Sequence, residues 1–315
     1  MTLEDFEVKK MFLLALLFIN FVFMAFSQNT SDFEYKEENG RITITRYNGT
    51  IKNVIIPERI NGLPVTTIGY RSFEQKQLIS VTIPNSVITI GEMSFASNQL
   101  TNVTIGNSVR IIDRWAFNSN QMTNIIIPNS VNYIRLGAFA DNQLTSVTIP
   151  DSVSEIGINA FANNQLTSVT IPDSVSKIDI GAFANNQLIN VVIPSSVEII
   201  EGCAFINNKL NEVSIPNGVT YINHGAFAFN QLSSIIIPNS VVRIDDGAFF
   251  GNRLTSVTIP NSVTYIGDGV FADNLITSIT IPDSVSNVGN WLISLESLID
   301  FDIIDKWFST AYLDK

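Results

Sequence analysis

Apolar residues recur along this chain with a period of 22 residues. The segment 144–154 returns letter for letter at 166–176, and no insertion or deletion interrupts the spacing through most of the sequence. A period of this length is typical of solenoids, in which each coil is too small to bury its own apolar face. Two columns of single residue types keep the same period, at Phe73, Phe95, Phe117, Phe139, Phe161, Phe183, Phe205, Phe227, Phe249 and Phe271, and at Asn98, Asn120, Asn142, Asn164, Asn186, Asn208, Asn230, Asn252 and Asn274. The pattern therefore predicts a β-rich stack of coils whose function lies on its surface.

Each copy of the repeat begins with a short strand and a turn. In one copy, Val147 and Ile149 alternate with polar residues, and this period of two with β-branched residues predicts a strand with one face inward. Pro150 ends the strand, and the next residues, Asp151-Ser152, turn the chain.

The second half of each copy completes the coil. Val153 and Ile156 are expected to point inward from a second extended segment, and Ala160-Phe161 fills the far end of the coil. Asn142 lies where the chain turns back, a place where an amide side chain can bond unsatisfied backbone groups. Counting Leu144, each copy has seven inward positions. About ten regular coils, spaced about 4.8 Å apart, predict a continuous core in a stack on the order of 50 Å long.

The two ends of the array depart from the repeat. Residues 28–50 are predicted to form an N-terminal cap hairpin with a turn at Asn39-Gly40, and the first coil of the solenoid at 51–288 is lengthened around residues 61–64. Beyond Val288 the period stops, and the C-terminal segment 289–315 carries apolar residues that are expected to cover the last coil: Trp291, Leu292, Leu295, Leu298, Phe301, Trp307, Phe308 and Tyr312.

Residues 1–27 have the pattern of a secretory signal peptide. A basic flank at Lys9-Lys10 precedes the apolar run 11–26, and Ala25-Phe26-Ser27 resembles an A-x-A cleavage site. The pattern predicts cleavage before Gln28 and export of the rest of the chain. A retained membrane anchor is the alternative, but Asn20 interrupts the apolar run and no stop-transfer flank follows it.

Charge and cysteine content narrow the functional classes. The formal net charge is −11 and the chain has no basic run, which argues against nucleic-acid binding, since phosphate-binding surfaces need clustered Lys and Arg. One cysteine in an exported chain provides no disulfide framework, so the stacked coils must supply the stability.

The repeat resembles a known family. The composite L-x-x-V-x-I-P-x-S-V-x-x-I-x-x-x-A-F-x-x-N, nearly intact at 144–164, 166–186 and 188–208, is similar to the BspA-type (treponemal) leucine-rich repeat, and the likeness covers about residues 51–288. It implies a right-handed leucine-rich-repeat coil stack in a bacterial surface or secreted protein. Some members of the family are adhesins for host matrix proteins or for other cells. The resemblance transfers no catalytic residue, and departures such as Gly106 in place of the repeat proline are confined to single coils.

Two constellations could carry chemistry. Asp246 lies one period after the single histidine, His224, while Cys203 lies 21 residues before it, so a cysteine hydrolase is one alternative. The offset of one residue argues against it, because alternate residues of an extended segment point to opposite faces. Carboxylates also stack between neighbouring coils and could bind calcium, although two carboxylates make a weak site and turn residues are the simpler interpretation: Asp151 with Asp173, Asp179 with Glu201, and Asp246 with Asp268.

Two surfaces are candidates for ligand binding. Outward positions of the first strand form a nearly uncharged hydroxyl platform that includes Thr148, Thr170 and Thr258, in which Glu212 is the one charge. Such rows also resemble ice-binding solenoids, but Glu212 and several apolar residues break the regularity that lattice matching needs. In the second segment, the variable position before the inward isoleucine carries residue types favoured at binding hot spots, namely Tyr133, Tyr221, Arg243 and Tyr265. Neutral drift of solvent-facing positions explains the same variety without a partner.

The sequence thus predicts an exported, monomeric, non-enzymatic leucine-rich-repeat protein that needs no cofactor or metal. Its expected role is adhesion or protein–protein contact at the bacterial cell surface. The expected partners are extracellular or host matrix proteins, or other cell surfaces, with no nucleic acid and no membrane span after signal cleavage. A passive envelope or matrix component without a specific ligand is the alternative.

Overall fold

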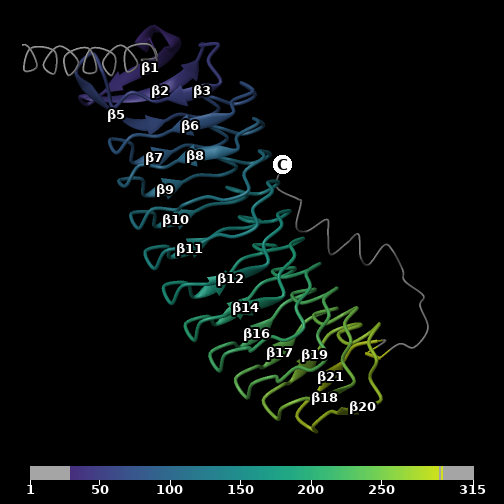
Figure 1. Ribbon diagram of the computed structural model, residues 1–315. Coiled ribbons are helices and arrows are strands. Elements are labelled where there is room, and N and C mark those ends of the chain that lie inside the picture. The colour runs from purple at the N-terminus through teal and green to yellow at the C-terminus, as the bar shows by residue number, and fades with distance from the viewer. Residues whose placement is uncertain (1–28, 291, 294–315) are drawn as a thin grey trace, which may run out of the picture.

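The computed structural model describes residues 29–290, 292 and 293, which form an elongated, curved stack of coils (Figure 1). The segment predicted to be a signal peptide and most of the predicted C-terminal cap lie outside the described residues. A short 3-10 helix, η1 (Thr30–Asp32), opens the fold. In the described part of the chain, no helix is long and apolar enough to cross a membrane.

A β-hairpin covers the N-terminal end of the stack. Strands β1 (Phe33–Glu38) and β2 (Arg41–Tyr47) pair antiparallel, and Asn39 and Gly40 between them have φ values of 51° and 69°. This left-handed backbone suits the Asn-Gly turn of a tight hairpin. Strand β2 then pairs parallel with β5 (Leu63–Ile68), which β4 (Arg59–Ile60) flanks in antiparallel orientation.

The second segment of each coil forms a ladder of short parallel strands. Equivalent residues pair in register one period apart, as Ile90 does with Ile112. The ladder is interrupted between β11 and β13, which belong to separate sheets. Its strands after β5 are β7 (Thr89–Ile90), β9 (Ile111–Ile112), β10 (Tyr133–Ile134), β11 (Glu155–Ile156), β13 (Lys177–Ile178), β15 (Ile199–Ile200), β16 (Tyr221–Ile222), β17 (Arg243–Ile244), β19 (Tyr265–Ile266) and β21 (Asn287–Val288).

The first segment pairs less completely than its sequence predicts. Its strands fall into three separate groups, with a single bridge between Ile126 and Thr148, and residues 212–214 and 234–236 of the described chain form no strand. The groups are β3 (Asn53–Ile55), β6 (Ser80–Thr82) and β8 (Asn102–Thr104); β12 (Ser168–Thr170) and β14 (Asn190–Val192); and β18 (Ser256–Thr258) and β20 (Ser278–Thr280).

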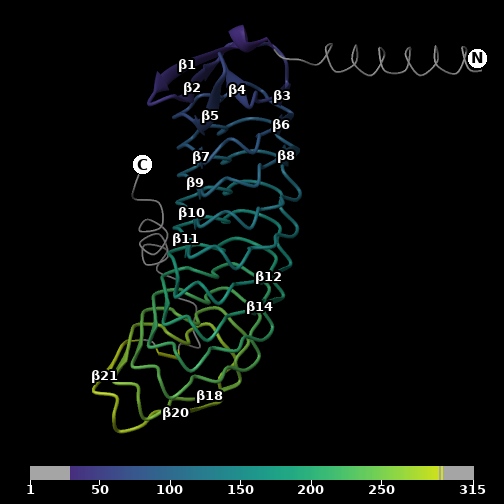
Figure 2. The same ribbon diagram turned by 90° about the vertical axis from the view of Figure 1, so that its left-hand side faces the viewer.

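The bend of the stack accounts for this difference between the two segments. Figure 2 shows the coils bending toward the side that carries β7, β9, β10, β11 and β21, which places that ladder on the inner face. Strands β12, β14, β18 and β20 lie on the outer side of the bend, where neighbouring coils must spread. Parallel strands pair only near a spacing of about 4.8 Å, so the outer ladder breaks first.

The core consists of the predicted inward columns. In one coil Leu144, Ile149, Val153, Ile156, Ala160 and Phe161 are buried, and Val147 is partly buried against the same core. Phenylalanine rings of successive coils stack with centroids 4.9–5.7 Å apart. These spacings lie within the range of favourable offset aromatic pairs, so the column is a continuous aromatic core rather than a set of isolated side chains.

The asparagine column joins each coil to the one before it. The Asn164 side chain is buried, and its Nδ2 donates to the carbonyls of Phe161, Ala162 and, in the preceding coil, Phe139, at 3.0–3.2 Å. Its Oδ1 accepts the backbone N–H of Leu144, the first residue of the same copy of the repeat, at 2.9 Å. One amide therefore satisfies four backbone groups in two coils, which confirms the role predicted for this position.

A serine column adds a second connection. The Ser152 hydroxyl donates to the carbonyl of Val131 in the preceding coil at 2.7 Å. Ser130 and Ser196 make the equivalent bonds to Val109 and Val175 at the same distance. At these positions the serine two residues after the repeat proline is more than a turn residue, because its hydroxyl also connects neighbouring coils. The equivalent hydroxyls of Ser86, Ser240 and Ser262 are buried without a hydrogen-bond partner among the described residues.

Replacing Phe161 with Ala is expected to lower the free energy of unfolding by about 3–5 kcal/mol, the usual loss when a large buried aromatic side chain is removed. Its ring stacks between Phe139 and Phe183, at 5.5 and 5.6 Å, so the loss should be largest in coils around 139–183. Denaturant titration measures the total loss in the free energy of unfolding, and hydrogen exchange shows which coils lose protection. Equal protection along the stack before and after the change would contradict the prediction.

Replacing Asn164 with Ala is expected to lower the free energy of unfolding by about 2–4 kcal/mol. The change leaves buried backbone groups of two coils without partners, and each unsatisfied group costs about 1–3 kcal/mol before the structure relaxes. The neighbouring Gln165→Ala, at an exposed position, is the matched control and should change the free energy by less than about 0.5 kcal/mol. Equal denaturation midpoints for the two variants would disprove the role of the amide.

Candidate functional site

Of the four candidate binding residues predicted in the second segment, three lie side by side on the inner face of the stack. Tyr221, Arg243 and Tyr265 occupy the first position of β16, β17 and β19, and the register pairs Tyr221 with Arg243 and Arg243 with Tyr265. Each side chain points outward because the next residue in its strand is the buried isoleucine of the core. The repeat period therefore brings together residues that are 44 positions apart in the sequence.

Arg243 is held on both sides by neighbouring groups. Its Nε donates to Oδ1 of Asp245 at 2.5 Å, and its guanidinium lies over the ring of Tyr265, 3.9 Å from the centroid. Partial burial alone would lower the pKa of Arg243, but the hydrogen bond and charge of Asp245 outweigh that effect and raise the pKa. A charged, partly exposed arginine whose position is already fixed is well suited to contact a partner.

Tyr133 stands apart from this group. It lies on β10, four coils before Tyr221. The Cζ atom of Arg135 lies over its ring, 5.4 Å from the centroid. Between the two tyrosines the same register carries Glu155, Lys177 and Ile199. The inner face between Tyr133 and Tyr221 therefore presents an acidic, a basic and an aliphatic side chain in place of tyrosine and arginine.

Lys177 carries the positive charge in this intermediate stretch. Its Nζ lies 3.1 Å from Oε1 of Glu201 and 3.4 Å from Oδ1 of Asp179. Partial burial would lower the pKa of Lys177, but these carboxylates raise it overall. The Lys177 ammonium is therefore paired with carboxylates of the same chain and does not form an unpaired cationic patch.

The predicted threonine platform extends over several coils and is interrupted by apolar residues. Thr148, Thr170 and Thr258 are all exposed on the first-segment side, but Thr258 lies four coils beyond Thr170. Exposed apolar side chains interrupt the row between them, since Val192 is 58% and Ile236 is 83% exposed. The sequence identified both interruptions but could not show that the strand ladder itself breaks there.

A shallow groove of about 770 Å³ lies over this break in the outer ladder. Val192 and Ile236 flank it, and Ser214 lies in the coil between them. Glu212, the charged residue of the platform, also lines it. The groove therefore combines apolar walls with one carboxylate. It occupies a small part of a surface that otherwise carries mainly hydroxyl groups.

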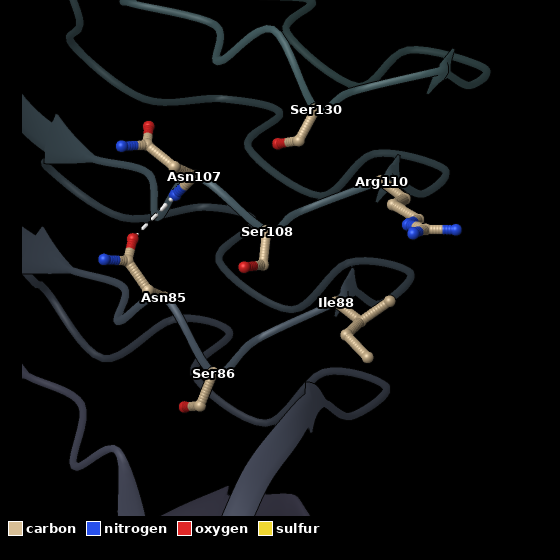
Figure 3. Close-up of a pocket in the computed structure, with 7 residues that line it drawn as sticks. All are labelled: Asn85, Ser86, Ile88, Asn107, Ser108, Arg110 and Ser130. Carbon is tan, nitrogen blue, oxygen red and sulfur yellow. Dashed lines mark hydrogen bonds between the residues drawn. The ribbon is translucent and has the colours of Figure 1, made fainter.

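A second hollow, of about 550 Å³, lies among the turns near the N-terminal end (Figure 3). The hydroxyl of Ser86 is buried and has no hydrogen-bond partner among the described residues. Figure 3 shows the hydroxyls of Ser86, Ser108 and Ser130 on one side and the side chains of Ile88 and Arg110 pointing away from them. The serine hydroxyls and the Arg110 guanidinium therefore do not point to one place where a single ligand could contact both.

The cysteine–histidine pair is poorly arranged for catalysis. Cys203 is buried, and burial raises the pKa of its thiol to about 12. A thiol with that pKa is almost fully protonated at neutral pH, whereas nucleophilic cysteines have lowered pKa values. One period places Cys203 level with Gly225, and the ring of His224 lies against Gly202, where an added side chain would collide with it.

The stacked carboxylates act within the structure. Oδ1 of Asp246 accepts the backbone N–H of Asp268 at 2.9 Å, and Oδ1 of Asp268 accepts that of Asn290 at 2.6 Å. Asp151 and Asp173 are exposed turn residues. Among the described residues there is no group of three or more His, Cys, Asp or Glu side chains suited to a metal ion.

Comparison with known proteins agrees with the repeat pattern. The family described as BspA type leucine rich repeat region (6 copies) matches residues 66–190 and 176–299. A leucine-rich repeat protein from Bacteroides ovatus ATCC 8483 is similar in structure, with a TM-score of 0.68 and 24% identity over 84% of this chain and 79% of that one. The pneumococcal vaccine antigen PcpA is similar with a TM-score of 0.52 and 21% identity over 84% of each chain. No curated protein matches this sequence.

The Cys203 thiol is expected to react at least about 100-fold more slowly with a neutral thiol reagent at pH 8 in the native chain than in the unfolded chain. Raising its pKa from 9.0 to about 12 lowers the thiolate fraction about a thousandfold, and burial also blocks access. Spectrophotometric titration with and without denaturant measures both rates. Rapid modification of the native chain would restore the hydrolase alternative.

Proposed function

The chain belongs to the BspA-type leucine-rich-repeat family, and from that premise we propose that it is an exported, non-enzymatic binding protein of the bacterial cell surface. It engages an extracellular or host matrix protein, or a protein on another cell, through the inner face of its stack. The family assignment supports a role in protein–protein contact. The basic flank and apolar run of residues 1–27 support export.

The observation that carries the proposal is the arrangement of Tyr221, Arg243 and Tyr265 on adjacent coils. Tyrosine and arginine are enriched at the centres of protein interfaces, where they bury large areas and donate hydrogen bonds. Because Asp245 and Tyr265 already hold Arg243, binding would order fewer side-chain rotations. The group thus has both the chemistry and the fixed geometry of an interface centre.

The area required for a stable complex implies that several coils take part. A standard interface buries about 800 Å² on each partner, and each coil exposes only a few side chains on this face. The inner-face ladder is continuous from β13 to β21, so residues such as Lys177 and Ile199 extend the contact surface from the central group. A shorter array would offer the same chemistry without enough area.

Two alternatives remain as outcomes of the test. A passive envelope component predicts no saturable binding. A cysteine hydrolase predicts loss of function on changing Cys203 and His224, which the raised pKa of the buried thiol argues against.

The triple variant Tyr221→Ala, Arg243→Ala, Tyr265→Ala is expected to weaken binding at least about tenfold, which corresponds to about 1.4 kcal/mol and is modest for a hot-spot group. The probes are immobilised collagen, laminin and fibronectin, together with intact neighbouring bacterial cells. Biolayer interferometry measures affinity for the proteins, and flow cytometry with labelled protein measures binding to cells. Circular dichroism must show that the variant keeps its fold.

Two matched variants identify the face that binds. Thr148→Lys, Thr170→Lys, Thr258→Lys places three charges on the outer side and should leave affinity within about twofold. Cys203→Ser with His224→Gln should also leave it unchanged. The proposal fails if no probe binds saturably, or if the inner-face variant binds like the parent while the outer-face or Cys–His variant loses binding.

A further inference from the structure

One corner of each coil, directly before the buried asparagine column, has a left-handed backbone. From residue 97 onward this corner row has φ values between 53° and 64° in the described coils. A left-handed backbone suits glycine, asparagine and aspartate and is unfavourable for bulky side chains. The row is made of Ser97, Ser119, Asp141, Asn163, Asn185, Asn207, Phe229, Gly251 and Asp273. Phe229 is its one bulky member, in a conformation that the other members adopt more easily.

The asparagines of the corner row form a chain of hydrogen bonds that ends next to Phe229. Nδ2 of Asn207 donates to Oδ1 of Asn185 at 2.8 Å, and Nδ2 of Asn185 donates to Asn163 at 2.7 Å. Asn163 in turn donates to the carboxylate of Asp141 at 2.7 Å. An asparagine at position 229 could continue the chain, but phenylalanine has no donor for Oδ1 of Asn207.

That side-chain oxygen is an open acceptor. Within the described part of the chain, Oδ1 of Asn207 accepts no hydrogen bond, and the side chain is only half-buried. Because the chain of amides starts at the carboxylate of Asp141, each amide polarises the next. Asn207 therefore presents a strengthened acceptor at the point where the row changes from amides to an aromatic ring.

Phe229 is one of three departures from the repeat that fit together. Phe250 stands where most copies have alanine, and its ring meets that of Phe229 edge to face, with centroids 5.2 Å apart and an angle of 69°. Gly251 leaves room for the Phe229 ring, since an added Cβ would lie 2.9 Å from its Cδ1. Both rings are half-buried against a small apolar cluster that includes Ile206 and Ala228. No other copy of the repeat carries an aromatic residue at either position.

Packing alone does not account for the choice of phenylalanine at position 229. An asparagine there would suit the left-handed backbone and could complete the chain of amides, as it does in the three preceding coils. Unfavourable backbone conformations of this kind are concentrated at sites where function requires the side chain. The aromatic pair and the open acceptor together point to a ligand.

We propose that the rings of Phe229 and Phe250, together with Oδ1 of Asn207, bind one sugar ring of a glycan. The C–H face of a pyranose carries partial positive charge and packs on the negative face of an aromatic ring. Hydroxyls at the edge of the same sugar are donors for a side-chain carbonyl. Neighbouring coils are about 5 Å apart, so a sugar that rests on Phe229 can donate a hydroxyl to Asn207.

The size and the charge of the site favour a sugar over other ligands. Two half-buried rings on adjacent coils present far less than the roughly 800 Å² that a protein partner needs. The neighbours of Phe229 in the corner row are Asn207 and Gly251, so no carboxylate of the row lies beside the ring to bind a cation. The site also uses none of the residues of the inner-face group around Arg243, so it does not depend on the protein-binding role proposed above.

Phe229→Asn separates a binding role from a packing role. The variant restores the residue type of the three preceding coils, so it is expected to denature at the same temperature as the parent or at a higher one. Thermal denaturation followed by circular dichroism measures the midpoint. A lower midpoint would show that the ring is needed for packing and would overturn the proposal.

Affinity electrophoresis of the purified protein tests sugar binding. The probes are native gels that contain soluble mannan, dextran, arabinogalactan or glycol chitin, and retardation over a range of polysaccharide concentrations gives the dissociation constant. At least one polysaccharide is expected to retard the parent, and Phe229→Asn should weaken that binding at least about tenfold because the stacking face is lost. Asn207→Ser, which places a residue type found elsewhere in the corner row, should weaken it at least about threefold because the acceptor is lost.

Ser119→Asn is the matched control, since it changes a corner-row residue five coils before Phe229 and should bind like the parent. The triple variant of Tyr221, Arg243 and Tyr265 should also be retarded like the parent, which keeps this test separate from that of the inner face. Absence of retardation by all four polysaccharides would reject the proposal. Binding of immobilised collagen that is lost in Phe229→Asn, without any retardation by polysaccharide, would instead assign the two rings to a protein partner.

Discussion

The structure depends on the buried hydrogen bonds that each asparagine of the repeat makes across two coils. A coil of 22 residues cannot bury its apolar side chains by itself, so its stability comes from contact with its neighbours. Contact alone would permit sliding, because apolar surfaces are not directional. The amide of Asn164 removes that freedom, since it reaches the carbonyl of Phe139 and the N–H of Leu144 only when adjacent coils are in exact period. An insertion of one residue would leave these groups buried and unpaired.

This constraint divides each coil into positions that cannot change and positions that can. The Phe, Asn and inward Ile columns are buried in nearly every described coil, whereas the residue before the inward isoleucine varies between tyrosine, arginine, lysine, glutamate and isoleucine. Variation there costs little stability because those side chains point away from the core. Any specific recognition must therefore arise in such columns, where the fixed register places the variable residues at regular intervals.

The period was enough to predict the core and the neighbours of each surface residue, but not the details that depend on three-dimensional shape. Phe161, Asn164 and the row containing Tyr221 and Arg243 were found from spacing, since one period equals one coil. The hydroxyl bond from Ser152 to Val131 was missed because serine after proline is also explained by a turn. The signal that could have revealed it was the recurrence of serine at that place in nearly every copy. Breaks in the outer ladder were missed because the bend accumulates over many coils and belongs to no single one.

The bend also decides which of the two candidate surfaces can act as a unit. On the outer side Thr170 and Thr258 are separated by two coils whose first segments form no strand, so no strand ladder connects the two threonines. On the inner side the ladder from β13 to β21 is continuous, and backbone hydrogen bonds hold Tyr221, Arg243 and Tyr265 in register. A rigid row loses less conformational freedom on binding than a loose one with the same residues. The same closeness of coils that gives the protein its core therefore also fixes the positions of the side chains on the proposed binding face.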